Sequence, residues 1–403
     1  MSQDRPIRVV LVVDDLGYGG AERQVVELAN NMDHDRFDVH VCALSDHLPL
    51  RDQLQIGRHN VHVIRRRTRF DITLVPRLAR LLRKVKADIV HGYLFRADNV
   101  GRLAGRLAGT ELIIGTERSA KYRSTRRNWL AYRLTRGCVD LVIANSKTGA
   151  DFNRATYGHS SLEYRVVYNG VNTERFRLRN RSKVRSQLGL SDTLRIVGVV
   201  ASFKPVKNHA MVLRAFKTVR ESSPDSHLLL VGDQLYGNIG GTSEYQAEIR
   251  GLIDELGLAE SCTFLGNRDD VELIYPACDL TVLASFYEGT PNVLLESMAC
   301  GIPVVATDVS DNSYIVREND TGFLVAVGDV TQMAHRMELL LGNNTLRQEM
   351  GRKARNRVLD EFSSQRLAEK TQAIYMQFLD KKRSCTDDVP LAVEGGNRSL
   401  HRS

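Results

Sequence analysis

The stretch SFYEGTPNVLLESMACGIPVVAT, residues 285–307, contains the end of one apolar strand, a short helix and a second apolar strand. We predict that the helix begins at Thr290 and Pro291, because threonine caps helix N-termini and proline is favoured at the first helical position. Gly301 is predicted to end the helix, since glycine readily takes the left-handed conformation that follows one. Two strands joined through a helix indicate a parallel unit of an α/β sheet.

Two glutamates stand at the start of this helix and inside it. Glu288 comes directly before the helix, and Glu296 lies a turn and a half within it. The spacing alone is uninformative, because Glu361 and Glu369 repeat it in an ordinary amphipathic stretch. The surroundings are informative: free amides at a helix start bind phosphate, and Gly289 allows close approach of the backbone. We expect one diphosphate-linked ligand here, with its phosphates on the amides, its ribose on one carboxylate and its sugar on the other.

Apolar, β-rich runs alternate with helical patterns twice along the chain. A helical pattern at 73–88 places leucines on one face and arginines on the other. Near-continuous apolar strands separated by helices are typical of parallel sheets covered on both faces. We therefore predict an α/β fold with two doubly wound Rossmann-like domains facing each other across a cleft, where ligands bind at the carboxyl ends of the strands. The predicted strands are 7–13, 38–44, 88–93, 112–117, 141–146 and 164–169 in the first series, and 194–202, 227–233, 263–266, 280–285, 303–307 and 322–327 in the second.

The segment 175–193 is polar and basic and shows no strand pattern, so we interpret it as the crossing between domains. The predicted N-terminal domain then covers 1–185 and the C-terminal domain 186–365. A helix at 366–382 is expected to pack back on the N-terminal domain, and 383–403 is expected to be a disordered tail.

The charge of the chain is unevenly distributed. The formal net charge is +8, and residues 51–136 alone contain 21 basic and 6 acidic residues. This asymmetry indicates an anionic partner (nucleic acid, an anionic membrane surface or a phosphorylated substrate), unless it is simply a solvated basic face. The six cysteines form no C-x-x-C pair and fit a reducing cytoplasm. No signal-peptide pattern or membrane-spanning run is found, so we expect a cytoplasmic enzyme, peripheral on the inner face of the membrane at most.

The stretch at 285–307 resembles the E-x7-E motif of the retaining glycosyltransferases of family 4, which have the GT-B fold. The resemblance extends over roughly residues 5–375. It implies a metal-independent enzyme that moves a hexose-type sugar from a nucleotide diphosphate to a glycan or lipid-linked acceptor in cell-surface polysaccharide synthesis and keeps the anomeric configuration. The segments that carry it, besides EGTPNVLLESMACGIPVVAT, are GGAERQ (19–24), YNGVNTERF (168–176), KPVKNH (204–209), LLLVGD (228–233), FLGNRDDV (264–271) and NDTGFLV (319–325).

The resemblance implies roles for the C-terminal half, which is the expected donor domain. Glu288 is similar to the glutamate that hydrogen-bonds the donor sugar, and Glu296 to the one that holds the ribose. Lys207 resembles the lysine that contacts the diphosphate. Asn267 and Arg268 follow the strand where the family's backbone reads the base, and Gly289 and Thr290 belong to the same donor site.

In the N-terminal half, the expected acceptor domain, Gly19, Gly20 and Glu22 belong to the glycine loop of the family. Their alternative interpretation is a tight strand-to-helix turn. Many members have a histidine near the reacting centre where this sequence has Glu117 followed by Arg118. His91, on the preceding strand, is the nearest histidine by topology, and its alternative role is that of a packed, hydrogen-bonded strand residue.

A second departure from the family pattern concerns the diphosphate. Many members have an arginine five residues before the diphosphate lysine, but Ser202 stands at that position. Lys204 is close enough to substitute for it, and the alternative is a solvated lysine.

Three other functions were weighed. A metal-dependent transferase with a D-x-D motif is rejected, because Asp33-His34-Asp35 lies in a polar turn between a helix and a strand. A GT-B-fold sugar-nucleotide epimerase would use the same nucleotide cleft without an acceptor, and the context of the two glutamates disfavours it. A non-enzymatic nucleic-acid binder is suggested by the basic half alone and has no aromatic RNA-recognition signature. We expect no cofactor and no metal, with a UDP-sugar as the donor.

Overall fold

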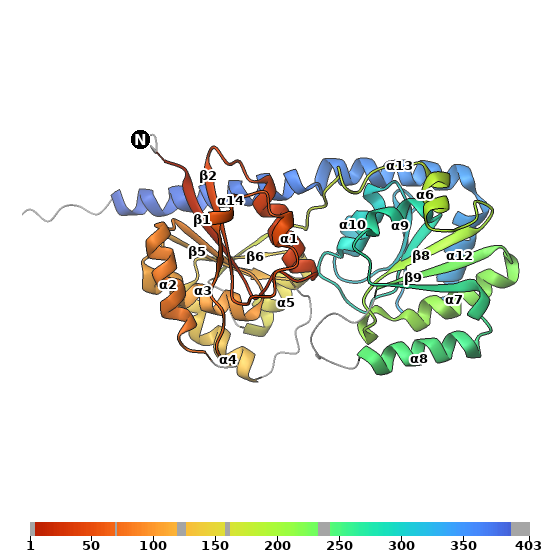
Figure 1. Ribbon diagram of the computed structural model, residues 1–403, viewed down its shortest axis with the longest axis horizontal. Helices are drawn as coiled ribbons and strands as arrows, with labels where there is room; N and C mark the ends of the chain where they lie inside the picture. The colour runs from red at the N-terminus through yellow and green to blue at the C-terminus, as the bar shows by residue number, and fades with distance from the viewer. Residues whose placement is uncertain (1–4, 69–70, 119–125, 158–161, 233–241, 388–403) are drawn as a thin grey trace, which may run out of the picture.

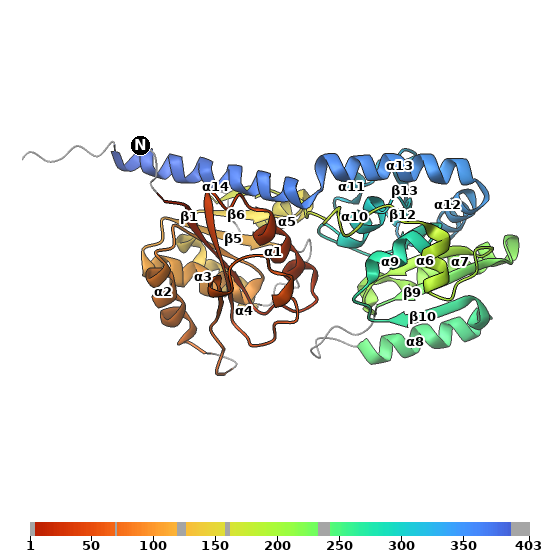
Figure 2. The ribbon, with the colours of Figure 1, turned by 45° about the horizontal axis from the view of Figure 1, so that its top comes forward.

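The computed structural model of the protein describes residues 5–68, 71–118, 126–157, 162–232 and 242–387. The chain forms two α/β domains side by side, and one long helix, α14, runs back from the second domain along the first (Figure 1). A view from a direction 45° away shows the same two bodies with α14 lying across the N-terminal one (Figure 2). The predicted fold class, two doubly wound domains, is confirmed.

Each domain is built on a parallel sheet. In the N-terminal sheet the strand order is β3-β2-β1-β4-β5-β6-β7, and in the C-terminal sheet it is β10-β9-β8-β11-β12-β13. The order reverses between β1 and β4 and again between β8 and β11, and these reversals are where doubly wound sheets bind ligands. The strands are β1 (Ile7–Val13), β2 (Phe37–Ala43), β3 (Val61–Val63), β4 (Ile89–Gly92), β5 (Leu112–Glu117), β6 (Leu141–Ala144), β7 (Glu163–Val166), β8 (Arg195–Val200), β9 (Ser226–Val231), β10 (Cys262–Gly266), β11 (Leu280–Leu283), β12 (Val304–Thr307) and β13 (Gly322–Val325).

Helices cover both faces of each sheet. In the N-terminal domain α1 and α14 pack on one face, while α2 and α3 pack on the other. In the C-terminal domain α7, α8 and α12 pack on one face and α9 and α10 on the other. The helices are α1 (Gly20–Asn31), α2 (Leu74–Val85), α3 (Phe95–Ala108), α4 (Arg126–Thr135), α5 (Lys147–Tyr157), α6 (Arg181–Gln187), α7 (His209–Ser222), α8 (Thr242–Glu255), α9 (Val271–Ala277), α10 (Asn292–Ala299), α11 (Asn312–Ile315), α12 (Val330–Gly342), α13 (Asn344–Glu361) and α14 (Ser364–Asp387).

Strand β1 shows why its apolar run is continuous. Val9 and Leu11 belong to the core under α1 and α14, whereas Val10 and Val12 belong to the core under α2 and α3. Successive side chains of a strand point to opposite faces, so a sheet covered on both sides needs an apolar residue at every position. Fully burying each such side chain stabilises the fold by about 1.5–3 kcal/mol.

The chain crosses between the domains twice, and the two crossings touch. The amide of Val171 donates to the carbonyl of Phe362 at 2.9 Å, and the amide of Ser364 donates to the carbonyl of Val171 at 3.0 Å. Gly170 lies so close to this junction that a Cβ there would stand 2.8 Å from the Cβ of Leu367. The two connections between the domains are therefore hydrogen-bonded to each other and closely packed.

The structure shifts two of the predicted boundaries. Helix α6 contacts α9 and buries Arg185 against Asp279 at 3.0 Å, so the whole helix belongs to the C-terminal domain. The predicted boundary at residue 185 falls inside this helix and is therefore too late. Helix α14 continues to Asp387, and Arg383 near its end pairs with Glu111 of the N-terminal domain at 2.7 Å. The tail predicted for 383–403 therefore starts too early, and residues 388–403 lie outside the described part of the chain.

Local details also differ from prediction. Strand β3 has three residues at the sheet edge, too short for an alternation pattern to reveal. Helix α10 begins at Asn292 with Pro291 at the cap position, and the Thr290 hydroxyl donates to the carbonyl of Asn145 instead of capping. Gly301 does take the left-handed conformation after α10, with φ of 73°. None of the helices in the described part of the chain combines the length and apolarity that crossing a bilayer requires.

Candidate active site

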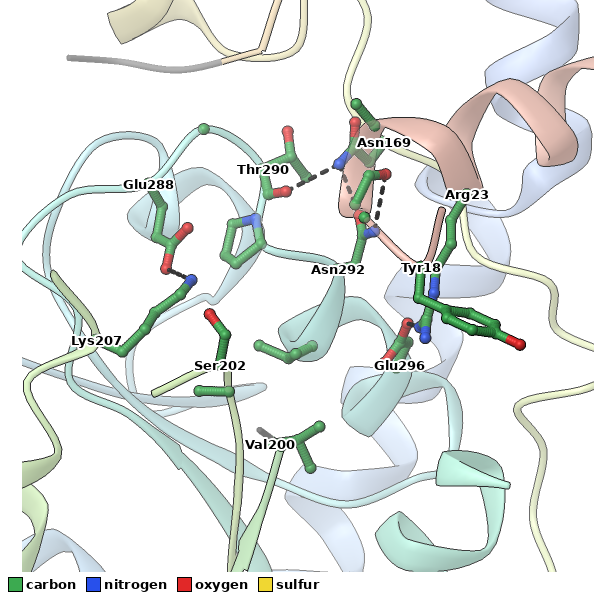
Figure 3. Close-up of a pocket in the computed structure, with 18 of the residues that line it drawn as sticks. Tyr18, Arg23, Asn169, Val200, Ser202, Lys207, Glu288, Thr290, Asn292 and Glu296 are labelled. Atoms are coloured by element: carbon green, nitrogen blue, oxygen red, sulfur yellow. Dashed lines mark hydrogen bonds and ion pairs between the residues drawn. The ribbon is translucent and has the colours of Figure 1, made fainter. Parts of the chain in front are cut away.

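A cleft of about 560 Å³ lies between the carboxyl edges of the two sheets. Loops that follow β1, β4, β5 and β6 line it from the N-terminal domain, and loops that follow β8, β9, β10 and β11 line it from the C-terminal domain. Figure 3 shows the side chains that project into it. The cleft thus occupies the point where the strand order reverses in both sheets.

Glu288 and Lys207 form an ion pair on one side of the cleft (Figure 3). The Nζ atom of Lys207 lies 2.5 Å from Oε1 of Glu288, and the Ser285 hydroxyl donates to the same oxygen at 2.6 Å. The Ser310 hydroxyl accepts from the backbone amide of Glu288 at 3.1 Å. Both members of the pair are half-buried in the cleft wall, so a cation and a carboxylate are held ready beside the space for a ligand.

Glu296 lies on the other side of the cleft in Figure 3 and is held at both oxygens. The hydroxyl of Tyr275, from α9, donates to Oε2 at 2.6 Å. Arg23, from α1 of the N-terminal domain, places Nη1 3.4 Å from Oε1. Burial and the neighbouring carboxylate raise the pKa of Tyr275 well above its usual range, which keeps the phenol a proton donor. A buried tyrosine therefore fixes the carboxylate, while the N-terminal domain supplies its counter-charge.

The remaining predicted donor residues also line the cleft. Lys204 is half-buried, and burial together with the charge of Lys207 lowers its pKa. It has no side-chain partner among the described residues, and Ser202 lies beside it in the cleft wall. Arg268 and Asn267 follow β10, and the Arg268 guanidinium binds both oxygens of Asp270, at 2.7 and 2.6 Å.

Gly289 is also needed for contact between the domains. A Cβ at this position would stand 2.6 Å from Oδ1 of Asn145 and 3.0 Å from the carbonyl of Arg118, both in the N-terminal domain. Such distances leave no room for any side chain. The expected close approach to a ligand is therefore accompanied by a close approach between the two domains.

A second link between the domains runs through Asn169, whose side chain is labelled in Figure 3. Its amide donates to the carbonyl of Thr290 at 2.9 Å and to Oδ1 of Asn292 at 2.7 Å. Its own oxygen accepts from Nη1 of Arg118 at 2.7 Å. Asn169 thereby links the start of α10 to the guanidinium of Arg118 in the N-terminal wall through hydrogen bonds.

The glycine loop enters the cleft at the start of α1. The Glu22 carboxylate folds back over Gly19, where a Cβ would stand 2.0 Å from Oε2. The carbonyl of Gly20 accepts from the Asn292 side chain at 3.3 Å. Burial, opposed by a hydrogen bond to its own amide, raises the pKa of Glu22 to about 7. The loop is therefore both a tight turn and part of the cleft wall. A side chain at position 19 would collide with the Glu22 carboxylate in its present position, so glycine here leaves the space that the carboxylate occupies.

His91 and Glu117 do not reach the cleft, which corrects the expectation that one of them stands near the reacting centre. The imidazole of His91 is enclosed between the Tyr375 hydroxyl and the Thr116 hydroxyl, each at 2.7 Å. Burial lowers its pKa well below the usual value, so it is a neutral interior group. Glu117 is buried on the opposite face of β5 and lines a separate small cavity there.

Arg118, directly after β5, lines the cleft at the place where the family resemblance predicts a histidine. Its guanidinium lies 4.9 Å from the ring centroid of Tyr93, and burial lowers its pKa. The side chains of a strand alternate, so residue 118 shares the face of Thr116 whereas residue 117 points away. That alternation was the signal in the sequence that could have found Arg118.

Other cleft residues were not predicted. They include Tyr18, Arg23, Leu94, Asn145 and Asn169. Leu94 has φ of 65° and ψ of 164°, a conformation that costs a non-glycine residue roughly 1–3 kcal/mol and is concentrated at functional sites. These positions come from the ends of several strands, far apart in the sequence. The rejected Asp33-His34-Asp35 motif lies in the turn after α1 and does not line the cleft.

Two family models match consecutive parts of the chain. Residues 18–175 match a family described as Glycosyltransferase Family 4, and residues 180–357 match Glycosyl transferases group 1. The first match covers the glycine loop, and the second covers both glutamates of the cleft together with Lys207.

Relatives and solved structures extend the comparison over most of the chain. The N-acetyl-alpha-D-glucosaminyl L-malate synthase of Bacillus anthracis is 26% identical over 77% of this chain and 80% of its own. The UDP-Gal:alpha-D-GlcNAc-diphosphoundecaprenol alpha-1,3-galactosyltransferase of Escherichia coli is 25% identical over 90% of this chain and 95% of its own. The crystal structure of HepE from Anabaena in complex with UDP and glucose superposes with a TM-score of 0.79 at 23% identity, covering 92% and 99% of the two chains. This last similarity bears on the fold alone.

Proposed function

The chain belongs to the family 4 glycosyltransferases of GT-B fold, and from this premise we propose that it transfers a hexose-type sugar from a UDP-sugar to a lipid-linked or glycan acceptor, with retention of configuration and without a metal ion. The Escherichia coli relative is named for UDP-galactose and a diphosphoundecaprenol-linked acceptor. This name supports the choice of nucleotide and of acceptor class.

One observation carries the proposal: the Lys207–Glu288 ion pair faces the doubly held Glu296 across one cleft. A diphosphate needs a cation, a sugar needs an acceptor for its hydroxyl protons, and a ribose needs a fixed carboxylate. We assign these tasks to Lys207, Glu288 and Glu296, and give Lys204 a second diphosphate contact. The base would then lie toward Asn267 and Arg268.

Lys207 changes partner in the proposed reaction. In the free enzyme Glu288 neutralises it, whereas a bound diphosphate offers it a stronger anion. As the bond between the sugar carbon and the phosphate oxygen breaks, Lys207 and Lys204 stabilise the charge that collects on the diphosphate. One such donor is typically worth about 10²–10³ in rate. Positive charge from two lysines at this position would supply what a metal ion supplies in other transferases.

The acceptor hydroxyl attacks from the face that the diphosphate leaves. A bond forms between the acceptor oxygen and the sugar carbon, the bond from that carbon to the phosphate oxygen breaks, and the hydroxyl proton passes to the departing phosphate oxygen. This scheme requires no protein nucleophile. It does require that water be kept from the sugar cation, which closure of a two-domain cleft accomplishes.

The test is a panel of nucleotide sugars incubated with the enzyme, with and without EDTA, scored by released nucleotide. We expect UDP to be released slowly from one UDP-sugar, at an unchanged rate in EDTA, and the freed sugar to appear first as the anomer present in the donor. An inverted sugar would overturn retention, and loss of rate in EDTA would overturn metal independence. Conversion of the donor to an epimer without release of UDP would assign the cleft to an epimerase instead.

A further inference from the structure

Helix α5 of the N-terminal domain receives part of its N-terminal cap from the other domain. The residue before the helix, Ser146, accepts a hydrogen bond through its hydroxyl from the amide of Gly149 at 3.1 Å. The amides of Lys147 and Thr148 donate instead to the carboxylate of Asp311, at 2.5 and 3.0 Å. The first amides of a helix have no partner within the helix, and a carboxylate placed there also faces the positive end of the helix dipole. Asp311 therefore completes a cap that Ser146 provides only in part, and we call this contact the cross-domain cap.

Two hydroxyl groups bind the same carboxylate. The Thr148 hydroxyl donates to Oδ1 of Asp311 at 2.6 Å, and the hydroxyl of Tyr168, which follows β7, donates to Oδ2 at 2.8 Å. Asp311 is 6% exposed, and burial by itself would raise the pKa of its carboxyl group. The hydrogen bonds outweigh burial and lower this pKa instead, so the carboxylate is charged at neutral pH. A loop of the C-terminal domain, between β12 and α11, thus supplies one carboxylate for four donors of the chain that precedes the first crossing.

The residue before Asp311 connects this cap to a carboxylate of the cleft. The Ser310 hydroxyl accepts from the backbone amide of Glu288 at 3.1 Å. Ser310 has φ of 51°, in the left-handed region that residues with a Cβ seldom occupy. Such backbone strain persists where the surrounding contacts hold it, and it is concentrated at functional sites. Here the two neighbouring side chains have different partners, since Ser310 binds Glu288 in its own domain and Asp311 binds α5 in the other.

A second contact between the domains lies next to Glu288 on the other loop. A Cβ at Gly289 would stand 2.6 Å from Oδ1 of Asn145, and the Thr290 hydroxyl donates to the carbonyl of Asn145. Asn145 lies between the end of β6 and the start of α5. The short segment that joins β6 to α5 therefore contacts both the loop that contains Glu288 and the loop that binds its amide. Movement of the N-terminal domain away from the C-terminal domain would break both contacts together.

We propose that Asp311 is a positioning residue for the transfer step: by capping α5 across the domain boundary it holds the cleft closed and, through Ser310, fixes the loop that contains Glu288. The Glu288 carboxylate is then correctly placed only while the N-terminal domain is in contact. Asp311 does not line the cleft, so it acts through its neighbours and not on the substrate. The kinetic part of this inference rests on the proposed function, whereas the cross-domain cap itself can be measured without a substrate.

Steady-state kinetics with the UDP-sugar found by the screen tests the positioning role. Asp311→Ala removes all four hydrogen bonds, and we expect kcat to fall by about ten- to hundredfold, the range for loss of a charge-assisted hydrogen bond. The donor KM should change by less than about threefold, because misplacing a group that acts in the transition state lowers kcat. Asp311→Asn keeps an oxygen, and asparagine caps helices about as well as aspartate, so this variant should recover most of the lost rate.

Small-angle X-ray scattering of the full-length protein without substrate measures the arrangement of the two domains. We expect Asp311→Ala to increase the radius of gyration and Asp311→Asn to stay close to the wild type. The matched control is Asp329→Ala, because Asp329 caps α12 within the C-terminal domain by accepting from the amide of Gln332 at 2.8 Å. This control also loses a helix cap, yet it should change neither kcat nor the radius of gyration. Circular dichroism verifies that each variant is folded.

A double-mutant cycle tests the connection through Ser310. Ser310→Ala removes the acceptor of the Glu288 amide but leaves Asp311 in place, so it should lower kcat without changing the radius of gyration. Because both substitutions act on one loop and through one carboxylate, the double variant should lose less rate than the product of the two single effects.

Three results would overturn the inference. An unchanged radius of gyration in Asp311→Ala would show that the cross-domain cap does not hold the domains together. An unchanged kcat in the folded variant would separate Asp311 from the transfer step. Independent effects of Asp311→Ala and Ser310→Ala would separate the cap from Glu288. If the wild type releases UDP from no UDP-sugar, the proposed function fails instead, and the scattering comparison still decides whether the cap holds the cleft closed.

Discussion

The two walls of the cleft hold their charges in different ways. In the C-terminal wall each carboxylate has a partner within hydrogen-bonding distance: Glu288 has Lys207 at 2.5 Å, and Glu296 has Tyr275 at 2.6 Å. In the N-terminal wall Glu22 and Arg118 are desolvated. Burial raises the pKa of Glu22 and lowers the pKa of Arg118, and both shifts favour the neutral form of the side chain. The C-terminal wall, which is the donor wall of the proposed function, therefore holds its carboxylates in place, whereas the charged groups of the N-terminal wall, its acceptor wall, are desolvated. Substitutions in the first should act on the reaction, and substitutions in the second on the response to pH.

The largest effect is expected at Lys207, the cation of the donor wall. Lys207→Ala removes the group assigned to the departing diphosphate, so turnover should fall by about 10²-fold or more. Lys204→Ala should lower turnover less, because Lys204 is the second contact. Steady-state kinetics with the UDP-sugar found by the screen measures both.

Lys217→Ala is the control for these lysines. Lys217 is a partly exposed residue of α7 that pairs with Glu221 at 3.7 Å outside the cleft, and its removal should leave the rate unchanged. If Lys207→Ala and Lys204→Ala both retain wild-type rates, the diphosphate is held elsewhere.

The two glutamates of the donor wall should differ in kind. A charge-assisted hydrogen bond is worth about 1.5–3 kcal/mol, so removing either should cost about ten- to hundredfold in kcat/KM. Glu296, held rigidly by Tyr275, should bind ribose equally well in the ground and transition states, so Glu296→Ala should raise the donor KM. Glu288→Ala should lower kcat, because its sugar contact changes as the bond breaks.

Glu369→Ala is the appropriate control for this pair. Glu361 is unsuitable, since it binds the largely buried Arg357 at 2.7 Å, whereas Glu369 is exposed and contacts Arg366 on its own helix. An effect of Glu288→Ala on KM alone would make Glu288 a binding group and remove it from the chemistry.

A smaller effect is expected at Tyr275, which does not line the cleft and positions Glu296. Tyr275→Phe removes the hydrogen bond to Oε2, and we expect the donor KM to rise by about three- to tenfold with kcat nearly unchanged, from a net hydrogen bond of about 1 kcal/mol. Tyr314→Phe, which removes a hydroxyl 3.4 Å from Glu361 outside the cleft, should change neither constant. A fall in kcat with constant KM for Tyr275→Phe would contradict a positioning role.

The last effect concerns Glu22 in the acceptor wall and appears in stability, not in kinetics. Its pKa of about 7 in the folded chain lies above the ordinary glutamate value of about 4.5, so the folded chain binds this proton more tightly than the unfolded chain. The contribution of Glu22 to the free energy of unfolding therefore falls as the pH rises from about 4.5 to about 7, and stays lost above that. Glu22→Gln does not ionise and keeps the length of the side chain. It should gain about 1–3 kcal/mol relative to the wild type between about pH 5 and about pH 8.

Urea unfolding at the two pH values measures this difference. Comparing the variant with the wild type cancels Asp14 and Asp98, whose pKa values burial also raises, to about 6 each. Glu369→Gln, at an exposed position, should show no gain with pH. An equal change for both variants would show that Glu22 ionises freely.

The donor wall could be predicted from the sequence because its groups stand close together along the chain. Glu288 and Glu296 flank the start of one helix, and Lys207 lies in one short turn after a strand. A local pattern of strand, glycine and helix start therefore contains most of the geometry. Every donor residue named from the sequence lines the cleft.

The acceptor wall could be predicted only in part, because it is assembled from distant strand ends. The glycine loop was predicted from its local pattern. His91, however, is hydrogen-bonded to Tyr375 of α14, which lies 284 positions away in the sequence. No local pattern reveals such a partner. Glu117 and Arg118 are neighbours in the sequence, and neighbouring side chains of a strand point to opposite faces. The prediction named Glu117, which is buried in the interior, whereas Arg118 lines the cleft.

Helix α14 has a consequence for the order in which the protein is synthesised. Tyr375, Phe378 and Leu379 belong to the core of the N-terminal domain, although the ribosome makes them after the whole C-terminal domain. Domains usually fold in the order of their synthesis, but here the first domain lacks part of its core until α14 has been made. Protease protection of nascent chains of increasing length would reveal the order. We expect the C-terminal domain, an uninterrupted segment, to become resistant first, so that the acceptor wall reaches its final form only once the last helix has left the ribosome.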